Sequence, residues 1–173
     1  RYSISTFFIQ VFSDENNMLI THEREKLINA IIYFARHTQY LGKIKLFKLL
    51  YLLDFEHFRQ TGQNVTGLDY RAWKFGPVPI DLYQEWDEPE QDMADAISIQ
   101  PEQIIHYVRE SVVPRAEFDD SHFSKRELRI MSELAGTAAR VARLHPLALL
   151  PEDQREGAKD IGDAHKRTGR CTA

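Results

Sequence analysis

The sequence has a single cysteine, Cys171, close to its C-terminal end. With one thiol the chain cannot form an internal disulfide, and it cannot build a zinc site from several thiolates. Long apolar runs are also missing, because no run approaches the roughly 18 residues that a membrane-spanning helix needs. These absences exclude a disulfide-stapled scaffold and a transmembrane helix, and they favour a cytoplasmic location.

Positive charge is missing from the middle of the sequence. No Lys or Arg lies between Lys74 and Arg109, whereas the same stretch carries Asp81, Glu85, Asp87, Glu88, Glu90, Asp92, Asp95 and Glu102. We interpret it as a solvated face or a mobile loop, and the alternative is a docking surface for a basic partner. The net charge of −4 and a pI near 6.0 weigh against direct DNA binding, which usually needs a basic face.

Aromatic residues are missing from the end of the sequence, since none follows Phe123. From Gly136 onward the chain is rich in Ala and Arg, which predicts a divergent and partly disordered C-terminal segment over residues 136–173, with one more helix over 138–150. We interpret residues 1–17 as an N-terminal tail or leader, with Met18 as a natural start. A single domain over residues 18–135 remains.

Two helices are predicted at the start of that domain. Apolar residues at helical spacing, with Thr21 as N-cap, predict an amphipathic helix from His22 to about His37. The next helix, from Lys43 to about Gln60 and ended by Gly62, is apolar almost all round. Helices of that kind lie in the centre of a fold, so we expect this one to dominate the core.

The second half of the domain mixes strand and helix signals. Alternation over Leu68–Phe75 predicts a short strand that Gly76 and Pro77 stop, and Pro79 opens a helix to about Trp86. Pro101 to about Glu110 is predicted as a helix and Val112–Phe118 as an edge strand, and the two predicted strands are expected to pair antiparallel. The fold class is therefore mainly α (α+β): a single compact helical domain with a small two-stranded β element.

The sharpest local signal is a capping box. Ser124 and Glu127 have the spacing in which each side chain binds the other residue's backbone N–H, and Phe123 with Leu128 supplies a hydrophobic staple. This predicts a helix from Lys125 to about Ala135.

Catalytic chemistry is not indicated. The sequence contains no H-E-x-x-H motif, no Gly-rich phosphate loop and no G-x-S-x-G elbow. Its histidines lack a partner at metal-ligand spacing on one helix face, and His57 is expected to be a hydrogen-bonded structural residue. The sequence thus predicts a protein that is not an enzyme, with no catalytic residues, no cofactor and no metal.

A binding surface is the better prediction. Lys45 and Lys48 lie three positions apart on a shared helix face, where they either extend to solvent or grip an acidic partner, and Asp69 and Asp81 are alternative partners. In the turn from Lys74 through Val78, Gly76 allows a backbone geometry or close approach that a side chain would block, and Pro77 with Pro79 stiffens the chain. It forms a rigid corner that either is only structural or displays aromatic anchors for a protein partner. The predicted partner-binding residues are Lys45, Lys48, Trp73, Lys74, Phe75 and Tyr83.

The runs KLFKLLYLLDFEHF and TGLDYRAWKFGPVPIDLY resemble the Panacea domain of SocA-like antitoxins and phage-associated GepA-like proteins. The matching positions form a K-L-x-K-L-L-Y helix, a strand that ends in Lys-aromatic-Gly-Pro-Val, and a later F-S-x-x-E helix start. They are Lys45, Leu46, Lys48, Leu49, Leu50, Tyr51, Gly67, Tyr70, Lys74, Phe75, Gly76, Pro77, Val78, Tyr83, Phe123, Ser124, Glu127 and Leu128. The resemblance covers about residues 20–135.

The resemblance implies a prokaryotic antitoxin that binds and neutralises a cognate toxin, usually encoded by the adjacent gene, without enzymatic activity. An adaptor that delivers a bound partner to a protease, and a phage-associated interaction protein without a toxin, are the alternatives. The family is paired with many unrelated toxins, so it does not name the partner. Direct DNA binding is not expected, because the chain has no room for an added DNA-binding domain.

Overall fold

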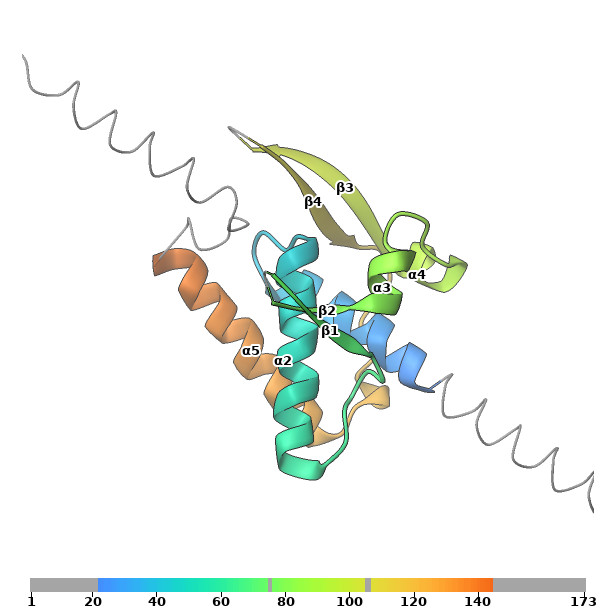
Figure 1. Cartoon of the computed structure of the whole chain (residues 1–173), viewed down its shortest axis with the longest axis vertical. Coiled ribbons are helices and arrows are strands. Elements are labelled where there is room, and N and C mark those ends of the chain that lie inside the picture. The colour runs from blue at the N-terminus through green and yellow to red at the C-terminus, as the bar shows by residue number, and fades with distance from the viewer. Residues whose placement is uncertain (1–21, 75, 105–106, 145–173) are drawn as a thin grey trace, which may run out of the picture.

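The structure is a computed structural model that describes residues 22–74, 76–104 and 107–144. A helix over residues 22–37 comes first. The elements that follow are α2 (Lys43–Thr61), β1 (Tyr70–Trp73), β2 (Gly76–Pro79), α3 (Ile80–Glu85), α4 (Gln91–Ala96), β3 (Ile97–Ile104), β4 (Tyr107–Pro114), the 3-10 turn η1 (Asp120–His122) and α5 (Lys125–Leu144) (Figure 1). The described residues confirm the mainly α (α+β) class.

The core forms around α2, as its composition predicts. Five apolar side chains of α2 are buried, and they meet apolar side chains from the N-terminal helix and from α5, which runs alongside α2 (Figure 1). The buried residues of these three helices are Leu27, Ala30, Ile31, Ile32, Phe34, Leu46, Phe47, Leu49, Leu50, Leu53, Ile130, Met131 and Ala135. Burying one Leu or Phe side chain contributes about 1.5–3 kcal/mol, so this cluster supplies most of the driving force for folding.

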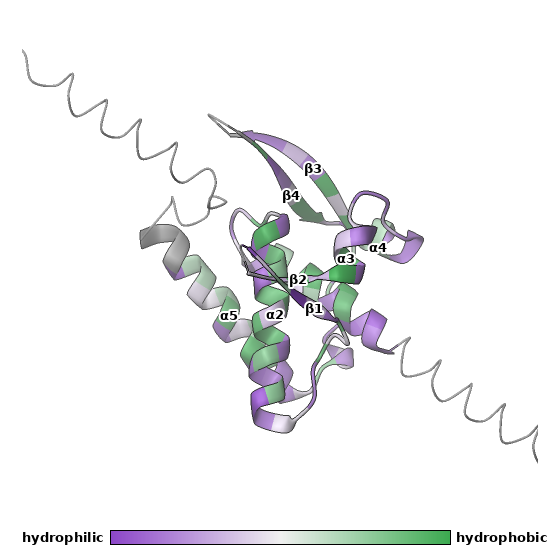
Figure 2. Cartoon of the chain, viewed as in Figure 1, coloured by the Kyte–Doolittle hydropathy of each residue, from purple (hydrophilic) through white to green (hydrophobic). Residues whose placement is uncertain are grey.

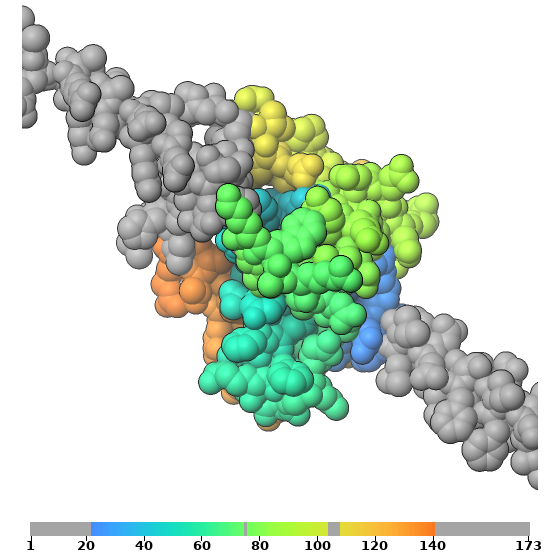
Figure 3. Space-filling view, in the orientation of Figure 1, coloured from blue at the N-terminus to red at the C-terminus, as the bar shows by residue number. Residues whose placement is uncertain are grey.

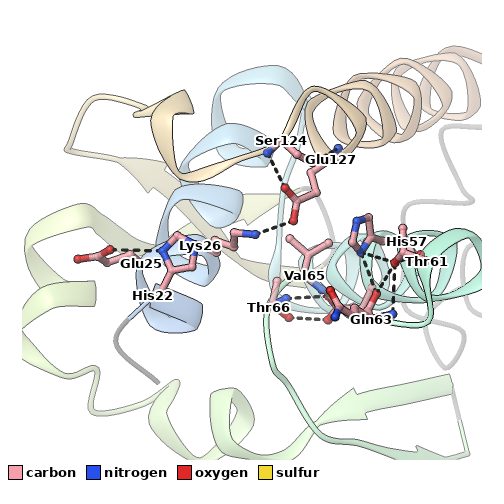
Figure 4. A network of polar contacts seen from close by, with 11 residues as sticks. His22, Glu25, Lys26, His57, Thr61, Gln63, Val65, Thr66, Ser124 and Glu127 are labelled. Carbon is pink, nitrogen blue, oxygen red and sulfur yellow. Dashed lines mark hydrogen bonds and ion pairs between the residues drawn. The ribbon is translucent and has the colours of Figure 1, made fainter. Parts of the chain in front are cut away.

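The C-terminal end of α2 follows its sequence signal. Gly62 adopts a left-handed conformation (φ 76°), and its N–H donates to Phe58 O, which is the geometry that ends a helix at glycine. His57 is buried and its Nδ1 lies 2.8 Å from Gln63 O, so it is the structural histidine that was expected (Figure 4).

The capping box at the start of α5 is confirmed. Ser124 N donates to Glu127 Oε2 (2.6 Å), and Glu127 N donates to Ser124 Oγ (3.3 Å). Burial raises the pKa of the Glu127 carboxyl, but the hydrogen bonds from Lys26 and Ser124 outweigh it and lower the pKa. The helix then continues through Gly136 to Leu144, so the expected end near Ala135 and a separate helix from residue 138 are wrong. A single glycine costs only about 1 kcal/mol in a helix interior and does not stop one.

The first hairpin corrects the prediction that Gly76 and Pro77 stop a strand. The chain turns at Lys74, and Gly76–Pro79 returns as β2, antiparallel to β1, with Trp73 opposite Gly76. Gly76 has φ 122°, a conformation that side chains disfavour, while an added Cβ would come no closer than 3.9 Å to Lys48. Backbone geometry, rather than close approach, therefore requires glycine here.

The second hairpin corrects two further predictions. Residues 101–104 and 107–110 are strand rather than helix, because Ile97–Ile104 and Tyr107–Pro114 form β3 and β4, which pair antiparallel with each other. The predicted strand over 112–118 accordingly ends at Pro114, and its partner is β3 rather than the strand at residues 70–73. Buried Ile97 and Val112 hold the base of this hairpin on the core, and Val112 N donates to Leu41 O (2.9 Å). In the sequence, apolar and polar residues alternate only near this base, at Ile97, Ser98 and Ile99. The short helix α4 before it is not predicted, because its residues show no clear helix signal.

The acidic stretch is folded rather than a mobile loop. It contributes α3, α4 and β3, and three of its carboxylates, Glu85, Glu90 and Asp92, surround the guanidinium of Arg24 on the N-terminal helix. These contacts raise the pKa of Arg24, the hydrogen bond to Glu85 being the largest cause. Part of the acidic charge thus stabilises the domain internally.

Among the described residues, no helix has the length and apolar character that a membrane span requires.

Candidate partner-binding surface

An aromatic corner forms where the β1–β2 hairpin meets α3. Trp73 and Tyr83 pack edge to face with their ring centroids 4.9 Å apart, and both side chains are exposed. Tyr83 also contacts the ring of buried Phe47 (6.5 Å), and Lys43 Nζ lies 4.5 Å from the Tyr83 ring centroid. Edge-to-face pairs and cation–π contacts hold rings in place, so the corner is preformed. The structure thus brings together Trp73 and Tyr83 as expected.

The two lysines of the sequence prediction have different surroundings. Lys48 is half-buried and lies against the hairpin, its Cε 3.9 Å from where a Gly76 Cβ would be. Lys45 points elsewhere, because its Nζ donates to Gln39 O (2.8 Å). Burial, and secondarily the charge of Arg109, lower the pKa of Lys45 to about 8. No ion pair joins either lysine to Asp69 or Asp81, which are all described residues.

One further predicted contact residue, Lys74, sits in the hairpin turn. Lys74 is described and exposed, directly after Trp73. Phe75 lies outside the described residues, so its predicted role stays a prediction.

A second exposed apolar group lies on α2, where the sequence predicted burial almost all round. Leu52, Phe55 and Phe58 follow one another at a spacing of three positions, so they lie along one side of the helix. Their side chains are 42%, 51% and 58% exposed. Figure 2 shows apolar residues along much of α2. The helix is therefore central but not enclosed. Sequence reasoning missed this face because every apolar position of α2 was counted as core.

The two exposed groups are connected through tyrosines. Tyr51 stacks on Phe55 (5.9 Å between ring centroids) and meets Tyr70 of β1 edge to face (5.3 Å). Strand β1 carries Tyr70 at one end and Trp73 at the other. Figure 3 shows residues of α2 and of the β1–β2 hairpin on the same face of the molecule. We call this the hairpin–α2 surface; its exposed members are Leu52, Phe55, Phe58, Trp73 and Tyr83.

A buried carboxylate fixes the segment between α2 and β1. Asp54 accepts hydrogen bonds from Val65 N (2.7 Å), Thr66 N (2.9 Å), Thr66 Oγ1 (2.5 Å) and Tyr70 Oη (2.8 Å). Burial, followed by the charge of Asp54, raises the pKa of Tyr70. Both oxygens of Asp54 are used in these bonds, so it acts as a structural anchor that sets the position of β1 against α2.

Two hollows flank β3 and β4, and neither includes a residue of the hairpin–α2 surface. One, of about 340 Å³, lies beside Trp86, Ile97 and Arg115, and the other, of about 390 Å³, lies beside Thr38, Tyr40 and Arg109. Thr38 Oγ1 is a buried atom without a hydrogen-bond partner in the described structure. The hairpin–α2 surface gathers exposed aromatic side chains, which are typical anchors for contact with a protein partner.

One known protein family matches the sequence of the chain. The sequence model of the family described as antitoxin SocA-like, Panacea domain, matches residues 46–143, more than half of the 173 residues. No curated protein and no solved structure matches the chain. The matched range runs from α2 through both hairpins to the end of α5, and so contains the whole hairpin–α2 surface. The chain therefore belongs to the antitoxin SocA-like, Panacea domain family.

Proposed function

We propose that this protein is an antitoxin-type binding module that neutralises a cognate protein toxin by covering part of the toxin's surface. The observation that carries the proposal is the hairpin–α2 surface, which leaves five large apolar side chains between 39% and 58% exposed within a domain of an antitoxin family. Exposed aromatic residues on a rigid support are typical anchors of protein interfaces, in which a few residues contribute most of the binding free energy.

The chemistry of the surface suggests what the toxin presents. The apolar stripe of α2 suits an apolar patch or helix of the partner. Lys43 and Lys48 on α2, with Arg71 and Lys74 on or beside β1, add cations around the aromatic corner. Acidic side chains on the partner next to its apolar patch would speed association and fix its orientation. We expect the toxin to be the product of an adjacent gene, and we expect this protein to have neither catalytic activity nor direct DNA contacts.

Growth rescue tests the proposal. The neighbouring open reading frame is expressed alone and together with this protein, and colonies are counted. Toxicity alone and growth in the pair is the expected result, and the double variant Phe55→Ser/Trp73→Ser should lose the rescue. Val108→Ser is the matched control, because Val108 is an equally exposed apolar residue (57%) on the other hairpin. A neighbour that is harmless alone, or that stays toxic beside soluble wild-type protein, would contradict the proposal.

Truncation separates direct occlusion from the adaptor alternative. An adaptor needs a tether that hands the complex to a protease, and the segment over residues 157–173 is the candidate for it. Deleting this segment should leave rescue intact if occlusion neutralises the toxin. Loss of rescue with retained binding would favour proteolytic delivery, and the toxin's half-life in the cell would then lengthen.

A further inference from the structure

Two histidines and a glutamate converge where the N-terminal helix (residues 22–37) meets the turn before α5. His22 and Glu25 lie one helical turn apart, and His122 comes from η1. Two imidazole nitrogens and one carboxylate oxygen all lie within 4.8 Å of one another. The Nδ1 atoms of His122 and His22 lie 3.4 Å and 4.0 Å from Glu25 Oε2. Sequence spacing could not reveal the group, because His22 and His122 are far apart in the chain.

These distances suit a tetrahedral cation. Zn²⁺ binds imidazole nitrogen and carboxylate oxygen at about 2.0–2.2 Å, which places any two ligand atoms about 3.3 Å apart. The separation between His122 and Glu25 already matches. His22 is exposed, so rotation of its side chain can shorten the longer separation. Two histidines and one carboxylate form a known donor set for zinc, with water in the fourth position.

The far side of the His122 ring provides a second observation. Its Nε2 lies 3.5 Å from Asp119 Oδ2, while the other oxygen of Asp119 accepts a hydrogen bond from Ser121 N (2.9 Å). Metal-binding histidines almost always donate their second ring N–H to a carboxylate or carbonyl, which fixes the tautomer and the ring orientation. His122 has the same arrangement, because one ring nitrogen faces Asp119 and the other faces Glu25 of the cluster.

The N-terminal helix and the turn before α5, which carry the cluster, are joined by other side-chain contacts. Asp119 N donates to the side-chain oxygen of Asn29 (2.9 Å), and Lys26 Nζ pairs with Glu127 (2.6 Å). Figure 4 shows His22, Glu25 and Lys26 together on the helix, with Lys26 reaching Glu127. These two bonds join the segments that carry the cluster, so a cation would find its ligands close to their final positions.

A contrast within the described residues shows that grouped acids alone do not make a site. Glu85, Glu90 and Asp92 also come within ligand distance of one another, but there the guanidinium of Arg24 is already bound to them. No such cation of the protein lies against His22, Glu25 and His122 in the described ion pairs. We propose that these three residues bind a divalent transition-metal cation of the zinc type, which ties the N-terminal helix to the turn before α5.

Calorimetry on the tag-free full chain tests this proposal, with ZnCl₂ as the probe and with CoCl₂ to follow coordination by visible absorption. One Zn²⁺ per chain is expected at this site, and Glu25→Gln and His122→Ala should each weaken its binding by at least about tenfold. Glu25 is exposed, so Glu25→Gln keeps the test valid even if His122→Ala disturbs the turn. His37→Ala is the matched control, since His37 lies on the same helix and stacks on Tyr33.

Thermal unfolding gives an independent readout. A cation that binds only the folded state raises the unfolding temperature, so ZnCl₂ should raise it for wild type and for His37→Ala but not for Glu25→Gln. Absence of Zn²⁺ binding would overturn the proposal. So would binding of unchanged affinity in both Glu25→Gln and His122→Ala, because the metal would then sit on other residues of the chain.

Discussion

The two faces of α2 carry similar residues in opposite surroundings. Leu46, Leu50 and Leu53 are fully buried, whereas Leu52, Phe55 and Phe58 are largely exposed on the same helix. Hydrophobicity along the helix does not distinguish the faces, since both are apolar. The difference arises from the neighbours, because α5 and the N-terminal helix cover one face, and the β1–β2 hairpin covers only part of the other.

The comparison separates the stability of the domain from its proposed function. A buried apolar side chain contributes to the free energy of folding. An exposed one contributes instead to the free energy of binding when a partner covers it. Substitutions on the two faces should therefore have opposite profiles: loss of stability on the buried face, and loss of binding at unchanged stability on the exposed face.

The largest effect on stability is expected from Leu50→Ala. Removing a fully buried leucine leaves a cavity, which typically lowers the free energy of unfolding by about 2–5 kcal/mol. Leu52→Ala is the matched control on the exposed face and should cost less than about 1 kcal/mol. Urea unfolding of both variants measures the difference. Equal losses would show that α2 does not have two distinct faces.

Asp54→Asn should have the next largest effect. The amide offers one acceptor oxygen where the carboxylate offers two, so donors among Val65, Thr66 and Tyr70 lose their partner at a cost of about 1–3 kcal/mol. Urea unfolding measures the loss. Glu56→Gln, two positions along the helix, removes only a surface ion pair with Arg59 and should shift the unfolding midpoint much less than Asp54→Asn does. A midpoint for Asp54→Asn equal to that of wild type would exclude the anchoring role.

Lys45 should make stability depend on alkaline pH. Its pKa is about 8 in the folded state and about 10.5 when unfolded, so between these values the unfolded chain binds more protons. The contribution of Lys45 to stability therefore rises with pH across this window, by about 1 kcal/mol after allowance for its partial exposure. Unfolding temperatures at pH 7.5 and 10 should show this gain for wild type relative to Lys45→Arg, whose guanidinium does not titrate there. Parallel pH profiles would disprove the lowered pKa.

The smallest effect on stability is expected from Phe55→Ser. Phe55 is half exposed and contacts Tyr51 on one side, so the free energy of unfolding should change by less than about 1 kcal/mol. Removal of exposed apolar area should also reduce self-association at high protein concentration, which sedimentation velocity can measure. A cooperative loss of folding would instead place Phe55 in the core.

The sequence predicts those elements whose signals lie within a short stretch of the chain. The N-terminal helix, α2 with its Gly62 end, and the capping box at Ser124 and Glu127 depend on a few adjacent residues, and they form as expected. The strands of the second hairpin depend on pairing with each other and on packing against the core. Because helix and strand signals are similar in a short segment of mixed polar and apolar residues such as residues 101–110, the packing partner decides between them.

The candidate surface could be predicted only in part. Trp73 and Tyr83 form the expected corner, because the stiff turn from β1 to β2 and α3 is encoded locally. Lys45 and Lys48 share a helix face but have different neighbours, since the loop at Gln39 binds one and the hairpin covers the other. The exposed stripe at Leu52, Phe55 and Phe58 could not be predicted, since composition does not reveal which face of an apolar helix lacks a neighbour.

The most direct test of the account is the affinity between the purified protein and the toxin candidate encoded by the adjacent gene. Isothermal calorimetry would compare wild type, Phe55→Ser/Trp73→Ser and the control Val108→Ser, with circular dichroism to verify folding. If the hairpin–α2 surface binds the toxin, the double variant should bind at least about tenfold more weakly while the control binds like wild type. Equal affinity of the folded double variant and wild type would contradict the account.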